Sequence, residues 1–274
     1  MSGAHRAAVL GSPIAHSLSP VLHRAAYREL GLDDWTYERH EVDEDGLKGF
    51  LDGLDQDWAG LSLTMPLKRA VIPLLDQVSA PAATVEAVNT VLFRGSSRIG
   101  DNTDIPGMRA ALAERGVDRV PAVTLLGAGA TAASALAAVA ELCTGAVTAR
   151  VRGHHRAEQM STLGERLGVA VAPRDWAGAA DSLAAPLVVA TTPAGATDAL
   201  VDAVPARPGT LFEVLYDPWP TPLAAAWRER GGTVVSGLDL LVHQAALQVE
   251  LMTGVERAPL EAMREAGRRA LAER

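Results

Sequence analysis

The sequence predicts an α/β protein with parallel sheets, divided into two domains. Short apolar runs alternate with longer helical patterns through most of the 274 residues. A polar stretch bounded by glycine, residues 100–107, ends the first half, and a fresh strand–turn–helix pattern starts at Val123. We therefore expect one domain before this stretch and a second domain after it.

The expected elements follow from periodicity and from turn residues. Short runs between turn residues predict strands at 7–10, 35–41, 61–64, 88–93, 123–126, 147–151, 187–190, 211–214 and 233–235. Helical spacing of apolar residues predicts helices over 20–30, 44–54, 105–115, 131–142, 156–167, 222–230, 238–253 and 259–272. No strand separates the last two helices, so the pattern leaves open whether they cap the second domain or return to the first.

Bulk composition excludes several classes of partner. The formal net charge is −8 and neither end carries a basic block, which argues against nucleic acid and anionic membranes. No apolar run approaches the about 20 residues that span a bilayer, and the start of the chain has no signal-like apolar region. The single cysteine, Cys143, excludes an intrachain disulfide, fits a reducing cytoplasm, and has apolar neighbours that predict a buried side chain. We expect a cytoplasmic protein that acts on a small molecule, with no metal site.

Lysine is rare in this chain. Only Lys48 and Lys68 occur, whereas arginine supplies the other 23 of the 25 basic side chains. Arginine stays protonated, but a lysine ammonium can give up its proton in suitable surroundings, so a retained lysine is a candidate proton carrier. Lys48 lies in an acidic stretch typical of a solvated helix face. Lys68 ends the apolar run 60–68, where the alternative is a lysine extending into solvent at a helix start.

A glycine-rich loop opens the second domain. The run 123–132 is a strand that leads into Gly127-x-Gly129-x-x-Ala132 and then a helix. In a dinucleotide-binding turn the first glycine allows the tight turn, the second lets the backbone approach a pyrophosphate, and a small third residue lets helix and strand pack. The helix N-terminus then favours the anion. A purely structural turn is the alternative, but strand, turn, helix and next strand all occur in order, so we predict a Rossmann-like cofactor domain.

The end of the next strand indicates which cofactor is bound. NAD sites usually carry an acidic residue there, whereas this chain has Arg150, Arg152 and Arg156 and no carboxylate before Glu158. Arginines at this position suit a 2′-phosphate, because a guanidinium forms paired hydrogen bonds to phosphate oxygens. A solvated basic loop is the alternative. The sequence therefore favours NADP over NAD.

Polar residues in the first half indicate a small polar substrate. Ser19 precedes Pro20 as an N-cap precedes a proline at the first helical position, and with Ser17 it offers a carboxylate site at a helix start. Capping alone would explain Ser19 but not Ser17. The pairs at 89–90 and 102–103 repeat Asn-Thr after apolar segments, and such amides form turns or bind hydroxyls.

Together these segments resemble the shikimate dehydrogenase family over nearly the whole chain. They occur in the family's order, at residues 11–20, 60–68, 88–90, 102–104, the loop at Gly127, Arg152 with Arg156, 192–195, 216–222 and 237–244. The resemblance implies an N-terminal α/β substrate-binding and catalytic domain, residues 1–104, completed by residues 238–274. It implies a doubly wound NADP-binding domain at 105–237, with the helices after Gly237 returning to the first domain and catalysis in the cleft between the domains.

The resemblance also implies the reaction, namely the reversible NADPH-dependent reduction of 3-dehydroshikimate to shikimate in aromatic amino-acid (chorismate) biosynthesis. It assigns Lys68 and Asp104 to catalysis as a proton-sharing pair. It assigns the substrate to Ser17, Ser19, Thr64, Asn89, Tyr216 and Gln244. It assigns the cofactor to Gly127, Ala128, Gly129, Ala130, Thr131, Arg152, Arg156, Thr191 and Gly237.

Several alternatives stay open from the sequence. Tyr216 could be a core residue and Gln244 an ordinary polar helix position. The substrate could be quinate or an aminoshikimate, and a catalytically silent NADP-binding regulator is disfavoured only by the presence of both catalytic residues. The chain departs from the family at Ser62, usually asparagine, at Val151, also usually asparagine, at Ala130, where glycine is common, and at Asp239, where a small residue is usual. Monomer and homodimer are both compatible with the sequence.

Overall fold

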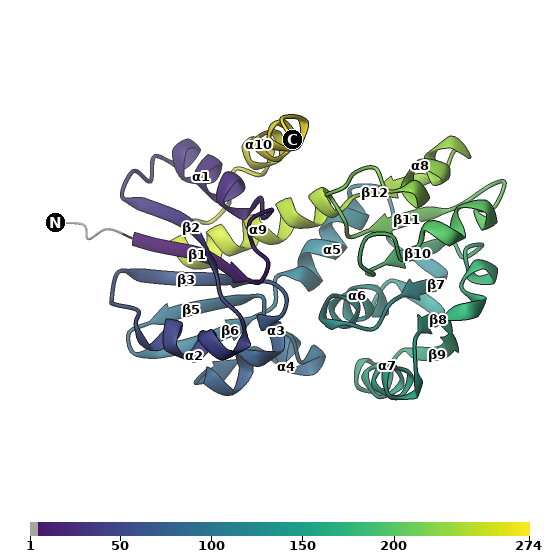
Figure 1. Cartoon of the computed structure of the whole chain (residues 1–274), viewed down its shortest axis with the longest axis horizontal. Helices are drawn as coiled ribbons and strands as arrows, with labels where there is room; N and C mark the ends of the chain where they lie inside the picture. The colour runs from purple at the N-terminus through teal and green to yellow at the C-terminus, as the bar shows by residue number, and fades with distance from the viewer. Residues whose placement is uncertain (1–4) are drawn as a thin grey trace. The chain divides into compact units, whose positions relative to one another are not determined.

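The computed structural model describes residues 5–274, which form two compact units. Unit 1 comprises the chain up to Gly107 together with Leu241–Arg274, and unit 2 comprises Met108–Leu240. The chain passes from one unit to the other within helices α5 (Asp104–Ala113) and α9 (Gly237–Thr253). Each unit has its own six-stranded sheet (Figure 1). The predicted α/β class and the return of the C-terminal helices to the first unit are confirmed.

The unit 1 sheet has the strand order β2-β1-β3-β5-β6-β4. Its strands are β1 (His5–Gly11), β2 (Trp35–Glu41), β3 (Trp58–Leu63), β4 (Gln77–Val78), β5 (Thr90–Arg94) and β6 (Ser97–Asp101). Strand β1 pairs in parallel with β2 and β3, but β5 pairs antiparallel with both β3 and β6. The prediction of parallel sheets is therefore wrong for this unit. Only two residues connect β5 to β6, and such a short hairpin connection requires antiparallel strands.

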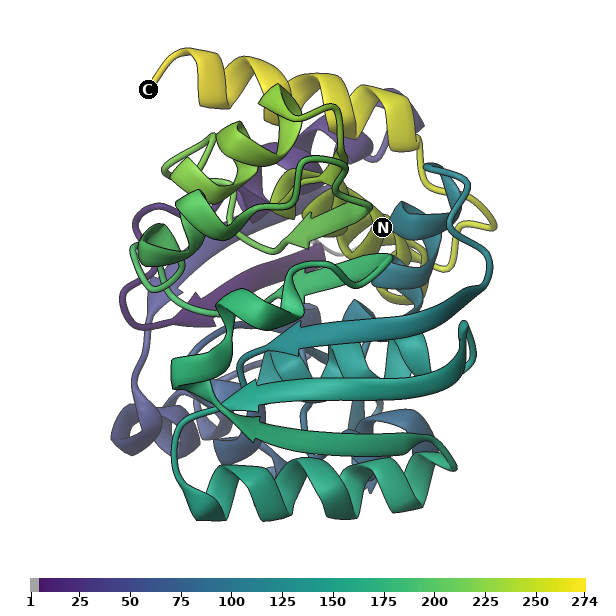
Figure 2. The same ribbon diagram turned by 90° about the vertical axis from the view of Figure 1, so that its right-hand side faces the viewer.

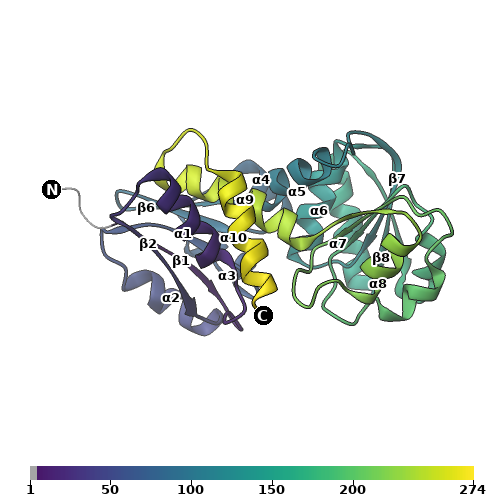
Figure 3. The ribbon, with the colours of Figure 1, turned by 90° about the horizontal axis from the view of Figure 1, so that it is seen from above.

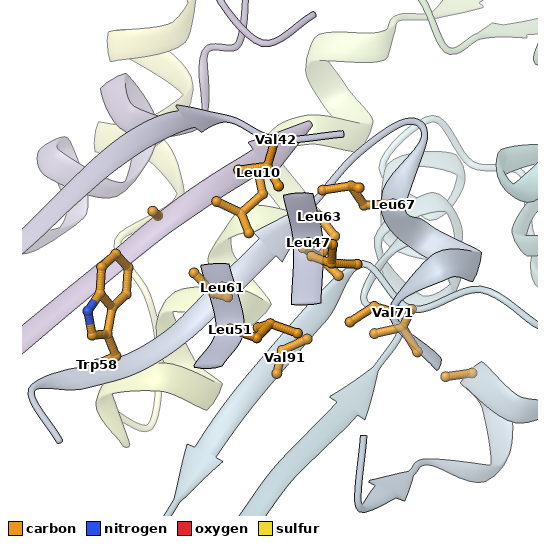
Figure 4. Close-up of a cluster of buried hydrophobic side chains, with 13 residues drawn as sticks. Leu10, Val42, Leu47, Leu51, Trp58, Leu61, Leu63, Leu67, Val71 and Val91 are labelled. Atoms are coloured by element: carbon orange, nitrogen blue, oxygen red, sulfur yellow. The ribbon is translucent and has the colours of Figure 1, made fainter. Parts of the chain in front are cut away.

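Helices cover both faces of the unit 1 sheet. They are α1 (Ser19–Leu30), α2 (Glu44–Asp52), α3 (Leu67–Ala70), α4 (Ala80–Val85), α9 and α10 (Leu260–Ala272), with a 3₁₀ turn at Ile72–Leu74. On one face, Leu47 and Leu51 of α2 pack on Leu10, Leu61 and Leu63 of the sheet (Figure 4). Helices α1 and α10 lie side by side (Figure 3).

Helix α9 packs on the opposite face of the same sheet. Successive residues of a strand point to opposite faces, and Leu61 and Leu63 face the α2 core. Gly60 therefore points to the other face. A Cβ atom at Gly60 would lie 2.8 Å from Met252 of α9, so glycine is what allows the helix to approach this strand closely. Ser62, two residues further along, points to the same α9-covered face.

The unit 2 sheet is parallel throughout, in the order β12-β11-β10-β7-β8-β9 (Figure 2). Its strands are β7 (Val120–Leu126), β8 (Cys143–Val151), β9 (Ala170–Asp175), β10 (Leu187–Ala190), β11 (Thr210–Glu213) and β12 (Thr233–Val235). Its helices are α6 (Ala130–Ala140), α7 (His154–Leu167) and α8 (Pro222–Glu229), with 3₁₀ turns at Trp176–Gly178, Ala180–Ser182 and Asp198–Ala203. The order reverses between β7 and β10, which confirms the predicted doubly wound topology.

Two local predictions need correction. Cys143 begins β8 and is partly exposed, so the prediction of a buried cysteine is wrong, because α6 already ends at Ala140 and the residues after it form a turn. Strands β4, β6 and β9 and the short helices α3 and α4 were not predicted, because they are short or carry too few apolar residues for a periodic pattern. Within residues 5–274, no helix combines the length and apolar character that crossing a membrane requires.

Candidate active site and cofactor site

Strand directions bring the polar segments of unit 1 to one edge of its sheet. Strands β1 and β3 are parallel, so the loop after β1 and the segment from Thr64 to Lys68 leave the sheet at the same edge. Strand β5 runs the other way, and its first residue, Thr90, pairs with Ser62 near the end of β3. Strand β6 ends opposite Thr90, at Asp101, which places residues 102–104 at this edge too. The mixed sheet therefore gathers segments that are far apart in the sequence.

Lys68 forms a sheltered pair with Asp104. Lys68 lies in α3, and its Nζ is 2.6 Å from Oδ2 of Asp104, the first residue of α5. The two side chains are only 13% and 7% exposed. Lys48 differs, because its side chain is 70% exposed and pairs with Asp52 on the same helix. The structure thus places one of the two lysines on a solvated helix face and shelters the other against a carboxylate.

Asn89 joins the same cluster. Its Nδ2 donates to Oδ1 of Asp104 at 2.8 Å and to Oγ1 of Thr103 at 3.0 Å. A longer bond of 3.3 Å leads to Oε1 of Gln244 on α9. Asp104 thus accepts hydrogen bonds from Lys68 on one oxygen and from Asn89 on the other. The sequence-predicted residues form one connected polar cluster, in which Asp104, Asn89 and Gln244 are buried and Lys68 is partly buried.

The helix start at Ser17 and Ser19 differs from the prediction. Helix α1 begins at Ser19 itself, its N-cap is Leu18 in a right-handed helical conformation, and no side chain caps it. The prediction of Ser19 as N-cap is therefore wrong, because the chain is already helical one residue earlier. Oγ of Ser17 instead accepts the backbone N–H of Ser19 at 3.3 Å. Both serines are buried, and Pro20 follows as expected.

The loop after β1 lies against the segment that carries Lys68. The Ser12 N–H donates to the carbonyl of Met65 at 3.0 Å. A Cβ atom at Gly11 would lie 2.4 Å from Cγ2 of Thr64 and 2.9 Å from the same carbonyl, so only glycine allows this approach. Thr64 is half-buried at the end of β3. The segment with Ser17 and Ser19 and the segment with Thr64, all predicted to bind the substrate, are thus neighbours in unit 1.

Unit 2 has a pocket of about 220 Å³ at the carboxyl end of its sheet. This is the edge where α/β sheets of this topology bind ligands. Eleven residues line the pocket: Gly127, Ala128, Gly129, Arg150, Val151, Arg152, Arg156, Trp176, Thr192, Pro193 and Ala196. Five of them are cofactor residues predicted from the sequence, and Trp176, Thr192, Pro193 and Ala196 were not assigned there.

The glycine-rich loop has the geometry its pattern predicts. Gly127 has φ +120°, a conformation that side chains with a Cβ rarely adopt, and a Cβ there would lie 2.5 Å from Oγ1 of Thr191. Around Gly129, the N-cap of α6, a Cβ would meet no protein atom within 4 Å, which leaves room for a ligand beside the backbone. Ala130 and Thr131 begin α6, whose free N–H groups favour an anion. These residues could hold a dinucleotide pyrophosphate.

The three arginines at the end of β8 and just beyond it are held differently. Arg150 is bound to the protein, since Nε donates to Oγ of Ser182 at 2.7 Å and Nη1 to the Asp175 carbonyl at 2.9 Å. Arg156 donates to the Ala128 carbonyl at 3.2 Å. Arg152 lies over the Trp176 ring, with Cζ 5.2 Å from the ring centroid. Arg152 lines the pocket, and within residues 5–274 its guanidinium makes no hydrogen bond, so its donors are available to a ligand.

The other predicted residues of unit 2 lie outside the pocket lining. Thr191 Oγ1 donates to the Leu126 carbonyl at 3.0 Å and ties the end of β10 to β7. A Cβ atom at Gly237 would lie 2.1 Å from the Val214 carbonyl oxygen, so close backbone packing alone requires this glycine. Tyr216 is half-buried shortly after β11, so the structure does not make it a core residue. Within residues 5–274, no three His, Cys, Asp or Glu side chains cluster as metal ligands would.

The fold and these two sites define a class, that of a two-domain nucleotide-dependent dehydrogenase with a doubly wound cofactor unit. The model of the shikimate dehydrogenase substrate binding domain matches residues 9–91, and that of the shikimate 5′-dehydrogenase C-terminal domain matches residues 237–266. A shikimate dehydrogenase (NADP(+)) from Synechococcus sp. (strain JA-3-3Ab) is 35% identical, covering 97% of this chain and 94% of its own length.

Solved structures agree with these matches. The crystal structure of Mycobacterium tuberculosis shikimate dehydrogenase superposes with a TM-score of 0.89 at 42% identity, covering 97% of this chain and 99% of that one. The shikimate 5-dehydrogenase of Thermus thermophilus, solved in complex with NADP(H) and shikimate, gives 0.85 at 33% identity and covers 97% and 99%. The chain belongs to the shikimate dehydrogenase family. The predictions of the family, of an oxidoreductase and of NADP as its cofactor are confirmed.

Proposed function

We propose that this chain catalyses the reversible NADPH-dependent reduction of 3-dehydroshikimate to shikimate. The contact of 2.6 Å between Lys68 Nζ and Asp104 Oδ2 carries the proposal. Reduction of a ring ketone by hydride leaves a negatively charged oxygen that needs a proton, so a positioned acid is required. Lys68 is the only lysine of the chain held in a sheltered site, and the family relatives named above act on shikimate with NADP.

The residues of unit 1 divide the work around this proton. The Lys68 ammonium donates a proton to the new alkoxide oxygen, and in the oxidation direction the neutral amine takes the hydroxyl proton back. Asp104 holds Lys68 in place and balances its charge, while Asn89 fixes Asp104 from the other side. We assign the substrate carboxylate to Ser17 and Ser19 and the ring hydroxyls to Thr64, Asn89 and Gln244. Tyr216 remains a substrate contact on the resemblance alone.

The residues of unit 2 fit a phosphorylated dinucleotide. Bound NADPH would supply the hydride to the substrate ketone. Gly127, Ala128 and Gly129 line the pocket beside the start of α6 and suit the pyrophosphate. Arg152 and Arg156 suit the 2′-phosphate, since guanidinium groups bind phosphate oxygens in pairs. We keep Ala130, Thr131, Thr191 and Gly237 as supporting residues of this site.

The first experiment is a substrate panel. Shikimate, quinate and an aminoshikimate are each offered with NADP and with NAD, and nicotinamide absorbance is followed. We expect the highest kcat/KM for shikimate with NADP. A higher value for quinate or an aminoshikimate would move the chain to another substrate within the same family. Tight NADP binding without turnover of any substrate would favour a silent NADP-binding regulator.

We also propose a cytoplasmic location. The single cysteine, Cys143, is free, which fits the reducing conditions of the cytoplasm. The assignment of substrate binding to unit 1 and of cofactor binding to unit 2 is part of the same proposal. It is supported by the place of the Lys68 cluster in unit 1 and of the arginine-lined pocket in unit 2.

A further inference from the structure

A second buried polar cluster borders the Lys68–Asp104 pair in unit 1. It comprises Tyr37 of β2, Ser62 of β3, Thr90 of β5 and Gln248 of α9, which are 0%, 4%, 0% and 1% exposed. Ser62 and Thr90 are paired in the sheet, so both point to the face that α9 covers. Four fully buried polar side chains are costly unless each finds hydrogen-bond partners.

The hydrogen bonds of this cluster all run in one direction. Ser62 donates its single proton to Oε1 of Gln248 at 2.8 Å, so the Tyr37 hydroxyl must be the donor in its 2.6 Å bond to Ser62. With Oε1 facing Ser62, the Gln248 amide nitrogen faces the other way. It donates to Oγ1 of Thr90 at 2.9 Å and to the Asn89 carbonyl at 3.1 Å.

The same direction continues into the catalytic cluster. Thr90 accepts from Gln248, and its own proton goes to Oδ1 of Asn89 at 2.8 Å. This orients the Asn89 amide with its nitrogen toward Asp104, to which it donates at 2.8 Å. An asparagine amide is nearly symmetric in shape, and a flipped Asn89 would turn its oxygen toward the Asp104 carboxylate. Donation from Thr90, together with donation from the Thr103 hydroxyl to the same Oδ1 at 3.2 Å, therefore favours the orientation in which Asn89 donates to Asp104.

We propose that Gln248 is a positioning residue that fixes the direction of this hydrogen-bond chain and so keeps Asn89 donating to Asp104. Its consequence for turnover rests on the proposed function. The Thr103 backbone N–H also binds Oδ1 of Asn89, at 2.8 Å, so Gln248 shares this task with the backbone and its loss is expected to have a partial effect.

The test reverses the donor at position 248. In Gln248→Glu the carboxylate can only accept, so Thr90 must turn its proton away from Asn89. When that carboxyl is protonated it has one donor and an acceptor, so it can restore one of the two bonds that the Gln248 amide donates, the bond to Thr90. We expect kcat to fall about 3- to 10-fold at alkaline pH, the size of one or two neutral hydrogen bonds. The ratio of variant to wild-type kcat should recover as the pH falls, with little change in KM for shikimate.

Two further variants separate positioning from simple support of the fold. Gln248→Met keeps the shape but has no amide, so we expect a similar loss of kcat without recovery at low pH. Gln77→Glu makes the same change at an exposed position of β4 and should follow the wild type at every pH. Melting temperatures of all variants show whether the fold is kept. A Gln248→Glu profile parallel to that of wild type, or parallel to that of Gln248→Met, would overturn the proposal.

A measurement without turnover keeps this test independent of the proposed function. The side-chain amide resonances of Asn89, assigned with Asn89→Asp, report directly on its partners. We expect their pH dependence in Gln248→Glu to contain a transition that is missing from the wild type. Resonances that are the same in both proteins at every pH would overturn the positioning role. If the wild type fails to reduce NADP with shikimate, the proposed function is wrong. The resonances of Asn89 still test the positioning role in that case.

Discussion

The two units hold their functional side chains in opposite ways. In unit 1, Asp104 accepts from Lys68 at 2.6 Å and from Asn89 at 2.8 Å, and Asn89 is itself held by hydrogen bonds to Thr90 and Thr103. In unit 2, Arg152 stacks on Trp176 and makes no hydrogen bond within the described chain. A group that moves a proton gains from being held in advance, because misplacement by a fraction of an ångström is costly. A group that binds a charged ligand gains from keeping its donors available to the ligand.

The arginines of unit 2 show the same contrast within a few residues. Arg150 donates to Ser182 and to the Asp175 carbonyl, and so stabilises the residues that line the pocket. Arg152 lies over the face of an aromatic ring, a cation–π contact that does not use its N–H groups. Such a contact can hold an arginine side chain and leave its donors able to bind a phosphate.

The largest expected effect concerns Lys68 of unit 1, which is held against Asp104 before any ligand binds. Lys68→Ala removes the proposed acid, so kcat should fall about 10²–10⁴-fold while KM for shikimate changes little. Lys68→Arg should be equally impaired, because a guanidinium does not release its proton. Lys48→Ala, at the exposed lysine of α2, is the matched control and should keep wild-type kcat in the same steady-state assay. A Lys68→Ala protein with near-normal kcat would remove Lys68 from the mechanism.

Glu213, at the end of β11 in unit 2, is a buried carboxyl. Unlike Asp104, it has no lysine partner within the described residues. Burial, and secondarily the charge of Asp198, raises the pKa of Glu213 from 4.5 to about 7, although the Thr221 hydroxyl bond at 3.1 Å opposes this. The folded form therefore binds the proton more tightly than the unfolded form does. The contribution of Glu213 to stability is greatest below about pH 4.5 and is lost as the pH rises through 7.

The prediction for Glu213 concerns stability against pH. Glu213→Gln removes the titrating group. The unfolding free energy of the variant minus that of the wild type should therefore be about 2 kcal/mol larger at pH 8 than at pH 5. Denaturant unfolding at the two pH values measures this difference. Asp198→Asn should reproduce a small part of it. A difference that is the same at both pH values would show that Glu213 titrates as an ordinary carboxyl.

The next prediction concerns Arg152 of unit 2, whose donors are available to a ligand. Arg152→Ala should raise KM for NADPH about 10- to 30-fold, since charge-assisted bonds to phosphate are lost, and should barely change KM for NADH. The matched control is Arg228→Ala. Arg228 stacks on Trp219 at the same 5.2 Å but lies outside the pocket lining, so its loss should affect neither cofactor. Equal losses with NADPH and NADH would mean that Arg152 does not read the 2′-phosphate.

The smallest expected effect on activity concerns the substrate carboxylate. Ser17→Ala should weaken shikimate binding roughly tenfold, near the lower end for a hydrogen bond to a charged group. Because Ser17 also accepts the Ser19 N–H, a loss of up to about 1 kcal/mol of stability should accompany it. Asp43→Ala, which removes the N-cap of α2, supplies the comparison, a loss of stability without a loss of affinity. Unchanged shikimate affinity in Ser17→Ala would place the carboxylate elsewhere.

The sequence predicts those parts of the two sites that lie in continuous segments. The glycine-rich loop, the arginines after β8 and the lysine segment are each local patterns whose chemistry is evident from neighbouring residues. Lys68 and Asp104 could be paired beforehand only through the family resemblance. Their contact depends on the antiparallel β5–β6 hairpin, and the short, polar strand β6 gives no periodic signal.

The residues that were missed act across long separations. Trp176 follows β9, which was not predicted, and it reaches the pocket only because β9 pairs beside β8. Gln248 lies 158 residues from Thr90, and nothing in its own segment distinguishes it from an exposed helical glutamine. The role of Ser19 was mistaken because whether Leu18 is already helical depends on how the loop after β1 packs, and the Ser-Pro pattern cannot show this.

The central claim is that Lys68 and Asp104 work as one unit, and a double-mutant cycle on kcat tests it most directly. Groups that act together lose their joint contribution when either one is removed, so their losses do not multiply. We expect the Lys68→Ala/Asp104→Asn protein to be at most about 3-fold slower than Lys68→Ala alone. If the loss of the double variant instead equals the product of the two single losses, Lys68 and Asp104 act separately and the pair is not the centre of the site.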